Sequence, residues 1–232
     1  MTGSREERLE EIRERITAAA ARAGRSTEEI TLIAVSKTFP ESAIREVASL
    51  GQVDFGENKV QEFASKVDSL GRGEERSPLK WHFIGHLQRN KAKELIGRAD
   101  LFHALDSERL GEELQKRLEV ADSRLNCLVQ VNVSGEQSKF GVEPEELDAL
   151  LDDLKTFDRI RLKGLMTLAS PAETADKVRP ELALLRRLSE RISDRLDGPN
   201  PILSMGMSGD FEVAIEEGAT HVRIGSAIFG ER

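Results

Sequence analysis

Short apolar runs alternate with amphipathic helical patterns along the chain. Residues 32–35 are all apolar and lead into turn-forming residues, which is typical of a strand buried on both faces of a parallel sheet. The same criterion predicts eight strands, at 30–37, 53–57, 80–85, 101–105, 124–133, 161–168, 202–208 and 221–229. Helical spacing predicts a helix over 4–23 and further helices near 41–50, 58–70, 89–98, 107–121, 143–156, 174–196 and 210–217.

This strict alternation predicts an α/β fold with a parallel sheet. Eight strand–helix units within 232 residues are what a single (β/α)8 TIM barrel requires, with the helix at 4–23 as an extra N-terminal element. An open doubly wound sheet is the alternative fold. The most linker-like stretch, 71–78, is short and falls between a helix and a strand, so we interpret it as a loop and expect one domain over residues 1–232.

Composition narrows the classes of function. The formal net charge is −8, with acidic and basic residues interspersed, so we expect neither nucleic acid nor a membrane as a partner. No stretch approaches the ~18 apolar residues of a membrane span, and the first residues lack the apolar core of a signal peptide. A single cysteine, Cys127, excludes a disulfide within the chain. We therefore expect a cytoplasmic protein.

A lysine ends the first predicted strand. Lys37 stands at the carboxyl end of 30–37, and functional sites of TIM barrels lie at the carboxyl ends of the strands. Two interpretations fit this position. In one, the aliphatic stem leaves the strand and carries the amine into water. In the other, a desolvated amine forms a Schiff base with a carbonyl compound. The barrel geometry favours the second.

The loops after the seventh and eighth predicted strands carry glycine and serine residues. TIM barrels bind phosphate groups with these two loops, through backbone N–H groups and a helix N-terminus. Gly206, Gly209 and Gly225 permit close approach of the backbone, and Ser208 and Ser226 offer hydroxyl donors. Each glycine alone fits a tight turn equally well. Together, the two loops predict a phosphate-binding site.

Other polar residues compete for a place in this site. Arg223 lies in an apolar strand, where it is costly to bury unless it pairs with a carboxylate on a neighbouring strand or faces the barrel mouth. Asn58 follows the second predicted strand and either caps the next helix or lines the site. His82 and His86 are four residues apart, which in strand geometry puts them on the same face but far apart along it, and no further ligands cluster in the sequence, so we expect no metal site.

An aldehyde-reactive lysine, a phosphate-binding site and an arginine between them describe a site for pyridoxal 5′-phosphate (PLP). Five motifs carry a resemblance at this point: AVSKTFP, FGENKVQE, WHFIGHLQRNK, KGLMTLA and LSMGMSGDFEVAIEEGATHVRIGSAIFG. With them the chain resembles the pyridoxal phosphate homeostasis protein family, single-domain relatives of the alanine racemase barrel, from about residue 5 to residue 230. The resemblance implies a fold-type III PLP-binding barrel.

The resemblance also implies a role for individual residues. Lys37 would be the Schiff-base lysine, and Arg223 would face the pyridine nitrogen of the cofactor. Ser208, Gly225 and Ser226 would surround its phosphate group. The remaining cofactor-binding residues that we expect are Asn58 and Met207.

Three functions are open on this sequence. The first is a PLP carrier or reservoir without turnover, which acts in intracellular PLP homeostasis and supplies apo-enzymes that need the cofactor. The second is a PLP-dependent amino-acid racemase or decarboxylase. The third is a Schiff-base aldolase that uses no cofactor, for which no proton-relay signature stands beside Lys37.

Residue inventory favours the carrier. A racemase of the related fold uses the lysine and a tyrosine as its two bases, with help from a second β-domain. This sequence contains no tyrosine, and we expect no second domain after the eighth strand. An arginine at the pyridine nitrogen also keeps that nitrogen unprotonated, which weakens the ring as an electron sink. We therefore expect a monomeric carrier and no enzyme.

Overall fold

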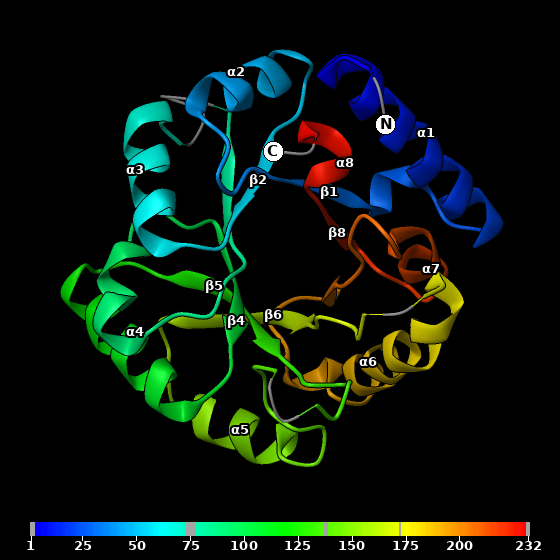
Figure 1. The fold of residues 1–232 in the computed structure, drawn as a ribbon. Helices are drawn as coiled ribbons and strands as arrows, with labels where there is room; N and C mark the ends of the chain where they lie inside the picture. Colours follow the sequence, from blue (N-terminus) through cyan, green and yellow to red (C-terminus); the bar gives the residue numbers. More distant parts are fainter. Residues whose placement is uncertain (1–2, 73–77, 137–138, 172, 231–232) are drawn as a thin grey trace.

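Eight parallel strands close into a barrel in the computed structural model of the chain, as the sequence predicts (Figure 1). The structure describes residues 3–72, 78–136, 139–171 and 173–230, so most of the predicted loop at 71–78 lies outside the described residues. The strands are β1 (Thr31–Val35), β2 (Asp54–Glu57), β3 (Lys80–Phe83), β4 (Leu101–Leu105), β5 (Leu125–Gln130), β6 (Ile160–Met166), β7 (Ile202–Ser204) and β8 (His221–Ile224). They pair in chain order and β8 closes on β1, which rules out the open sheet.

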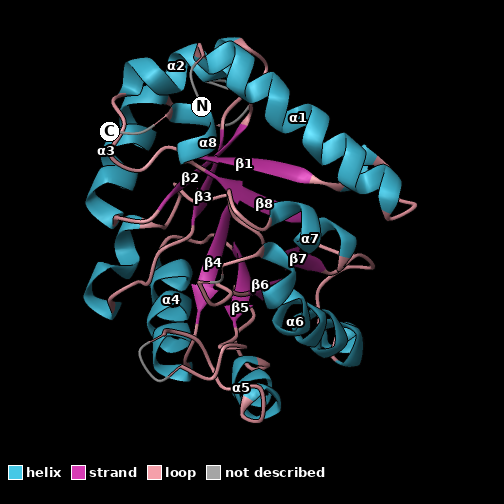
Figure 2. Cartoon of the chain, turned by 45° about the vertical axis from the view of Figure 1, so that its right-hand side comes forward, coloured by secondary structure: helices cyan, strands magenta, loops and turns pink. Residues whose placement is uncertain are grey.

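Helices form a ring around the barrel, as Figures 1 and 2 show. The α-helices are α1 (Arg5–Arg22), α2 (Glu41–Ser49), α3 (Val60–Leu70), α4 (Glu108–Val120), α5 (Leu147–Leu154), α6 (Arg179–Arg191), α7 (Phe211–Glu216) and α8 (Ser226–Phe229). The 3-10 helices are η1 (Thr27–Glu29), η2 (Arg89–Glu94), η3 (Ala175–Val178) and η4 (Ser193–Arg195). None of the described helices is long and apolar enough to cross a membrane.

The extra N-terminal helix α1 covers the barrel where its first and last strands meet (Figure 1). A capping box begins it: Ser4 Oγ accepts from Glu7 N at 3.2 Å, and Glu7 Oε2 accepts from Ser4 N at 2.8 Å. Leu9, Ile12 and Ile16 recur on one face and are buried, and the helix contacts α7 and α8. Burial of this apolar face holds α1 against the segments that follow β7 and β8.

Strand periodicity separates an apolar outer face of the barrel from a polar interior layer. On β3, the buried rings of Trp81 and Phe83 lie two residues apart and so share one face, and the ring centroid of Phe83 lies 5.4 Å from that of Phe63 in α3. His82, between them, faces the interior and meets His103 of β4, with 2.9 Å between ring nitrogens. Polar side chains therefore replace the branched apolar residues that usually fill such a layer.

The structure differs from the prediction where several elements end. β7 ends at Ser204 instead of 208, and the chain turns at Gly206, whose φ is +93°. β8 ends at Ile224, and residues 226–229 form α8 instead of more strand, since an apolar run this short does not distinguish strand from helix by its period. The predicted helix at 89–98 is the 3-10 helix η2 followed by turns.

Candidate functional site

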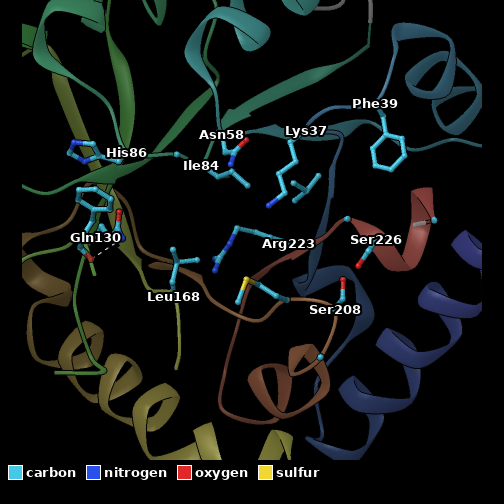
Figure 3. A pocket seen from close by; sticks show the side chains of 17 residues that line it. Lys37, Phe39, Asn58, Ile84, His86, Gln130, Leu168, Ser208, Arg223 and Ser226 are labelled. Carbon is cyan, nitrogen blue, oxygen red and sulfur yellow. Dashed lines mark hydrogen bonds between the residues drawn. The ribbon is translucent and has the colours of Figure 1, made fainter. Parts of the chain in front are cut away.

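A cavity of about 860 Å³ opens at the carboxyl ends of the strands (Figure 3). Its walls include Val35 at the end of β1 and Gln130 at the end of β5. All seven residues that the sequence predicts for cofactor binding line it: Lys37, Asn58, Met207, Ser208, Arg223, Gly225 and Ser226. The fold thus brings together residues that follow β1, β2, β7 and β8, with Arg223 on β8 itself.

Lys37 lies two residues beyond β1, in a turn whose next residue, Thr38, has φ +68°. Its side chain is exposed, so the expectation of a desolvated amine is wrong, because the strand ends before the lysine. Figure 3 shows the side chain reaching into the cavity toward Arg223. Within the described part of the chain, Nζ forms neither a hydrogen bond nor an ion pair. The cavity therefore contains an amine that is available to an aldehyde.

A buried lysine of α3 anchors the turn that carries Lys37. Lys66 Nζ donates to the carbonyl of Ser36 at 2.8 Å, and to carboxylate oxygens of Glu57 and Glu62 at 2.7 Å each. Ser36 Oγ donates to Glu57 Oε1 at 2.6 Å. Burial raises the pKa of Glu57, and the hydrogen bonds from Lys66 and Ser36 oppose this. The network fixes the backbone next to Lys37 without engaging the amine of the lysine itself.

Arg223 faces the centre of the cavity and is 3% exposed. Its Nη1 donates to Ser204 Oγ and its Nη2 to the carbonyl of Thr167, each at 2.7 Å. Both acceptors are neutral, and no carboxylate among the described residues forms an ion pair with the guanidinium, so the alternative of a salt bridge is not found. Burial lowers the pKa of Arg223 to about 10, against the attraction of Asp210. The group remains a cation at neutral pH.

Two serine hydroxyls face another part of the cavity. Ser208 lies between β7 and α7, and Ser226 is the first residue of α8, where helix N–H groups have no intrahelical partner. Figure 3 shows both hydroxyls on the same side of the cavity. Neither makes a hydrogen bond to any described residue. These two loops therefore present unpaired donors to a ligand, as the sequence predicts for a phosphate.

Glycines shape the two loops. A Cβ on Gly206 would lie 2.6 Å from Cβ of Ala214, so the tight turn after β7 depends on glycine. A Cβ on Gly225 would lie 3.1 Å from the carbonyl oxygen of Val35. Glycine at this position therefore allows the end of β8 to approach the end of β1 closely. Met207, 38% exposed, directly precedes Ser208 in the first of these loops and lines the cavity.

Asn58 lines the cavity and does not cap a helix. The N-cap of α3 is Lys59, and it makes no side-chain capping bond. Asn58 Oδ1 is buried and has no hydrogen-bond partner in the part of the chain that the structure describes. The glycine after Ile84 packs tightly on the Asn58 backbone, since a Cβ on Gly85 would lie 2.1 Å from the Asn58 carbonyl oxygen. A buried amide oxygen without a hydrogen-bond donor, on a tightly packed backbone at the cavity wall, indicates that a bound ligand supplies the donor.

The opposite wall of the cavity contains residues that the sequence does not predict. There His86 stacks on Phe140 with ring centroids 4.0 Å apart, and Gln130 Nε2 donates to the carbonyl of Phe140 at 3.0 Å. The other lining residues absent from the prediction include Phe39, Ile84, Gly85, Leu168 and Gly230. Ile84 follows β3, Gln130 ends β5 and Leu168 lies two residues after β6. The rule that TIM-barrel sites lie at the carboxyl ends of the strands, here called the carboxyl-end rule, would therefore have found them if applied to these three strands.

A family model described as alanine racemase, N-terminal domain, matches residues 8–232. Fold and sequence thus place the chain in the class of alanine racemase-like barrels. The chain is 45% identical over 226 residues to the pyridoxal phosphate homeostasis protein of Aquifex aeolicus (strain VF5), which covers 97% of each chain. The chain belongs to the pyridoxal phosphate homeostasis protein family.

Solved structures agree with this assignment. PipY of Synechococcus elongatus PCC7942, solved with PLP bound, superimposes with a TM-score of 0.80 at 34% identity, over 94% of this chain and all of PipY. Alanine racemase from Corynebacterium glutamicum superimposes with a TM-score of 0.72 at 17% identity, over 97% of this chain and 62% of the racemase. The second likeness concerns the fold alone, and it confirms the predicted barrel.

Proposed function

We propose that this chain binds PLP in the cavity and acts in PLP homeostasis as a carrier or reservoir, without turnover of amino acids. One observation carries the binding: a buried guanidinium, together with an amine and two hydroxyls that have no partner among the described residues, surrounds a single cavity. PLP, when bound, supplies an aldehyde that reacts with amines and a ring that can accept electrons.

The residues present fit the chemical groups of this cofactor. Lys37 offers an amine for the aldehyde, and Ser208 and Ser226 offer hydroxyl donors for the phosphate. The guanidinium of Arg223 is directed at the centre of the cavity, where it suits the pyridine nitrogen. The unpartnered Oδ1 of Asn58 leaves an amide for a polar substituent of the ring. Each assignment rests on an atom that lacks a partner or faces the cavity.

Relatives support both parts of the proposal. PipY, 34% identical, was solved with PLP bound, and the Aquifex aeolicus relative is named for PLP homeostasis. The exposure of Lys37 adds a structural reason for a carrier. A cofactor attached at an exposed lysine stays within reach of an amine from outside the cavity, so an apo-enzyme could take it up.

Amino-acid chemistry lacks two requirements in this cavity. Racemisation by two bases needs a partner for Lys37, and the sequence contains no tyrosine for that role. An amino-acid substrate also needs a cation for its carboxylate. Among the described lining residues, the cations are Lys37 and Arg223, both used by the cofactor, while His86 stays at the rim. A guanidinium opposite the pyridine nitrogen further weakens the ring as an electron sink.

Deuterium exchange tests the absence of turnover. The protein loaded with PLP is incubated with a panel of L-amino acids in deuterated water, and α-proton exchange and enantiomer content are followed. We expect no exchange, together with measurable transfer of PLP to an apo-enzyme, and no transfer from a Lys37→Ala control. Exchange at the ~1 to 1000 per second typical of enzymes would refute the carrier and restore an amino-acid racemase.

A further inference from the structure

A chain of hydrogen bonds crosses the barrel interior beneath the cavity, through two histidines that the proposed function does not use. His82 Nδ1 lies 2.9 Å from His103 Nε2, and the two side chains are buried. His82 Nε2 lies 2.9 Å from Asp54 Oδ1, and His103 Nδ1 lies 2.9 Å from Ser204 Oγ. Ser204 Oγ also accepts from Arg223. Five side chains, one from each of β8, β7, β4, β3 and β2, therefore form a continuous chain from the cavity to β2. We call this chain the interior relay; its members are Arg223, Ser204, His103, His82 and Asp54.

With one proton on each imidazole ring, hydrogen-bonding rules give every bond of the interior relay a direction. Arg223 can only donate, and an ionised Asp54 can only accept. With a single proton on the ring, His82 donates its Nε2–H to Asp54 and accepts at Nδ1. Neutral His103 then donates its Nε2–H to His82 and accepts at Nδ1 from the hydroxyl of Ser204. Each of the four bonds of the relay then joins one donor to one acceptor, as the burial of such a network requires.

The charges of the interior relay are consistent with this direction. Burial lowers the pKa of His103 well below its usual range, and the charge of the nearby Arg223 guanidinium lowers it further. Burial, the largest single cause, would raise the pKa of Asp54, but the hydrogen bond from His82 and nearby positive charge such as that of Lys80 together outweigh it and leave the pKa lowered. His103 is thus neutral and Asp54 ionised at neutral pH. The guanidinium of Arg223 and the Asp54 carboxylate are the two charged ends.

We infer that Ser204, His103, His82 and Asp54 are positioning residues that hold the guanidinium of Arg223 toward the bound cofactor. The inference rests on the proposed function. Ser204 presents its lone pairs to Arg223 because its own hydrogen is used by His103. With the opposite histidine tautomers that hydrogen would be buried without an acceptor, since Ser204 is fully buried. The distant carboxylate therefore fixes the orientation of an acceptor at the cavity floor.

His221 provides a matched control in the same interior layer. Its ring centroid lies 6.1 Å from that of His82 and 6.5 Å from that of His103. It is hydrogen-bonded to Thr220, with 3.0 Å between Thr220 Oγ1 and His221 Nδ1, and is not a member of the interior relay. His221→Gln therefore changes the same polar layer and leaves the relay complete.

Nitrogen-15 NMR of the histidine rings tests the direction of the relay without any cofactor. At neutral pH we expect neutral Nε2–H tautomers for His82 and His103. In Asp54→Asn the new amide can either donate to His82 or accept from it, so both histidines should become tautomer mixtures, while His221→Gln should leave them unchanged. Nδ1–H tautomers in the parent, or unchanged tautomers in Asp54→Asn, would overturn the inference.

PLP titration followed by absorbance tests the effect on the cofactor. Ser204→Ala removes an acceptor of Arg223, so we expect about ten-fold weaker binding and a changed absorbance spectrum of bound PLP, with parent-like behaviour in His221→Gln. Parent-like affinity and spectrum in Ser204→Ala would contradict the positioning role.

If circular dichroism shows that Ser204→Ala is unfolded, Asp54→Asn replaces it in the titration. A parent-like absorbance spectrum of PLP bound to Asp54→Asn would contradict the positioning role equally. A parent that does not bind PLP refutes the proposed function, and the NMR result still decides the direction of the relay.

Discussion

The hydroxyl of Ser226 faces the cavity without a partner among the residues that the structure describes. If it donates to the phosphate, Ser226→Ala loses one charge-assisted hydrogen bond, about 1.5 to 3 kcal/mol, so PLP affinity should fall roughly ten-fold or more. Absorbance titration measures this. Ser49→Ala, on an exposed position of α2, is the control and should bind as the parent does. A folded Ser226→Ala variant with parent affinity would place the phosphate elsewhere.

Single residues can be predicted from the sequence where a rule ties position to function. Lys37, Ser208 and Ser226 follow strands, and the carboxyl-end rule assigns them to one site. His103 lies inside β4, and Ser204 lies inside the strand that the apolar pattern extends to residue 208, so neither carries such a signal; their role depends on which side chains meet across the barrel. Distances between non-neighbouring strands follow from barrel closure, which no local pattern encodes.

The turn after β7 depends on Gly206, because its φ is +93° and a Cβ at this position would lie 2.6 Å from Cβ of Ala214. Gly206→Ala should therefore lower the free energy of unfolding by about 1 to 3 kcal/mol, and weaken PLP binding by displacing Ser208. Urea unfolding measures the first effect. In the same loop, a Cβ on Gly209 would meet nothing within 4 Å, so Gly209→Ala should keep the stability of the parent. Equal stability of the two variants would contradict this account of the loop.

At the scale of elements, the sequence predicts types better than boundaries. The eight predicted strands all exist, because a strand buried on both faces is an uninterrupted apolar run. The apolar pattern wrongly predicts α8 as a continuation of β8, because its three consecutive buried residues are too short a run to show a helical period. What separates the two elements is the backbone at Gly225, with φ −115° and ψ −81°, and this is not visible in the apolar pattern.

The barrel as a whole should lose stability in acid because of its interior histidines. Burial lowers the pKa of fully buried His103 well below its usual range, and lowers that of partly buried His221 to about 3. An unfolded histidine has a pKa of about 6.5, so the unfolded chain binds protons first as the pH falls. The stabilisation is complete above about pH 6.5 and is lost below it, by up to about 1.4 kcal/mol per pH unit for each histidine.

Urea unfolding between pH 7 and pH 4 measures this loss. The variant His221→Gln lacks one of the two groups, so its free energy of unfolding should decline less steeply than that of the parent. An identical pH dependence in the two proteins would show that His221 does not resist protonation in the folded state.

The proposed function places PLP on one lysine at the mouth of the barrel. The most direct measurement is to load the protein with PLP, reduce it with borohydride and map the labelled peptides. We predict that the pyridoxyl group lies on Lys37, the amine that reaches into the cavity, and that Lys37→Ala remains unlabelled there. A label found mainly on Lys59, Lys139 or Lys163 would contradict the central claim.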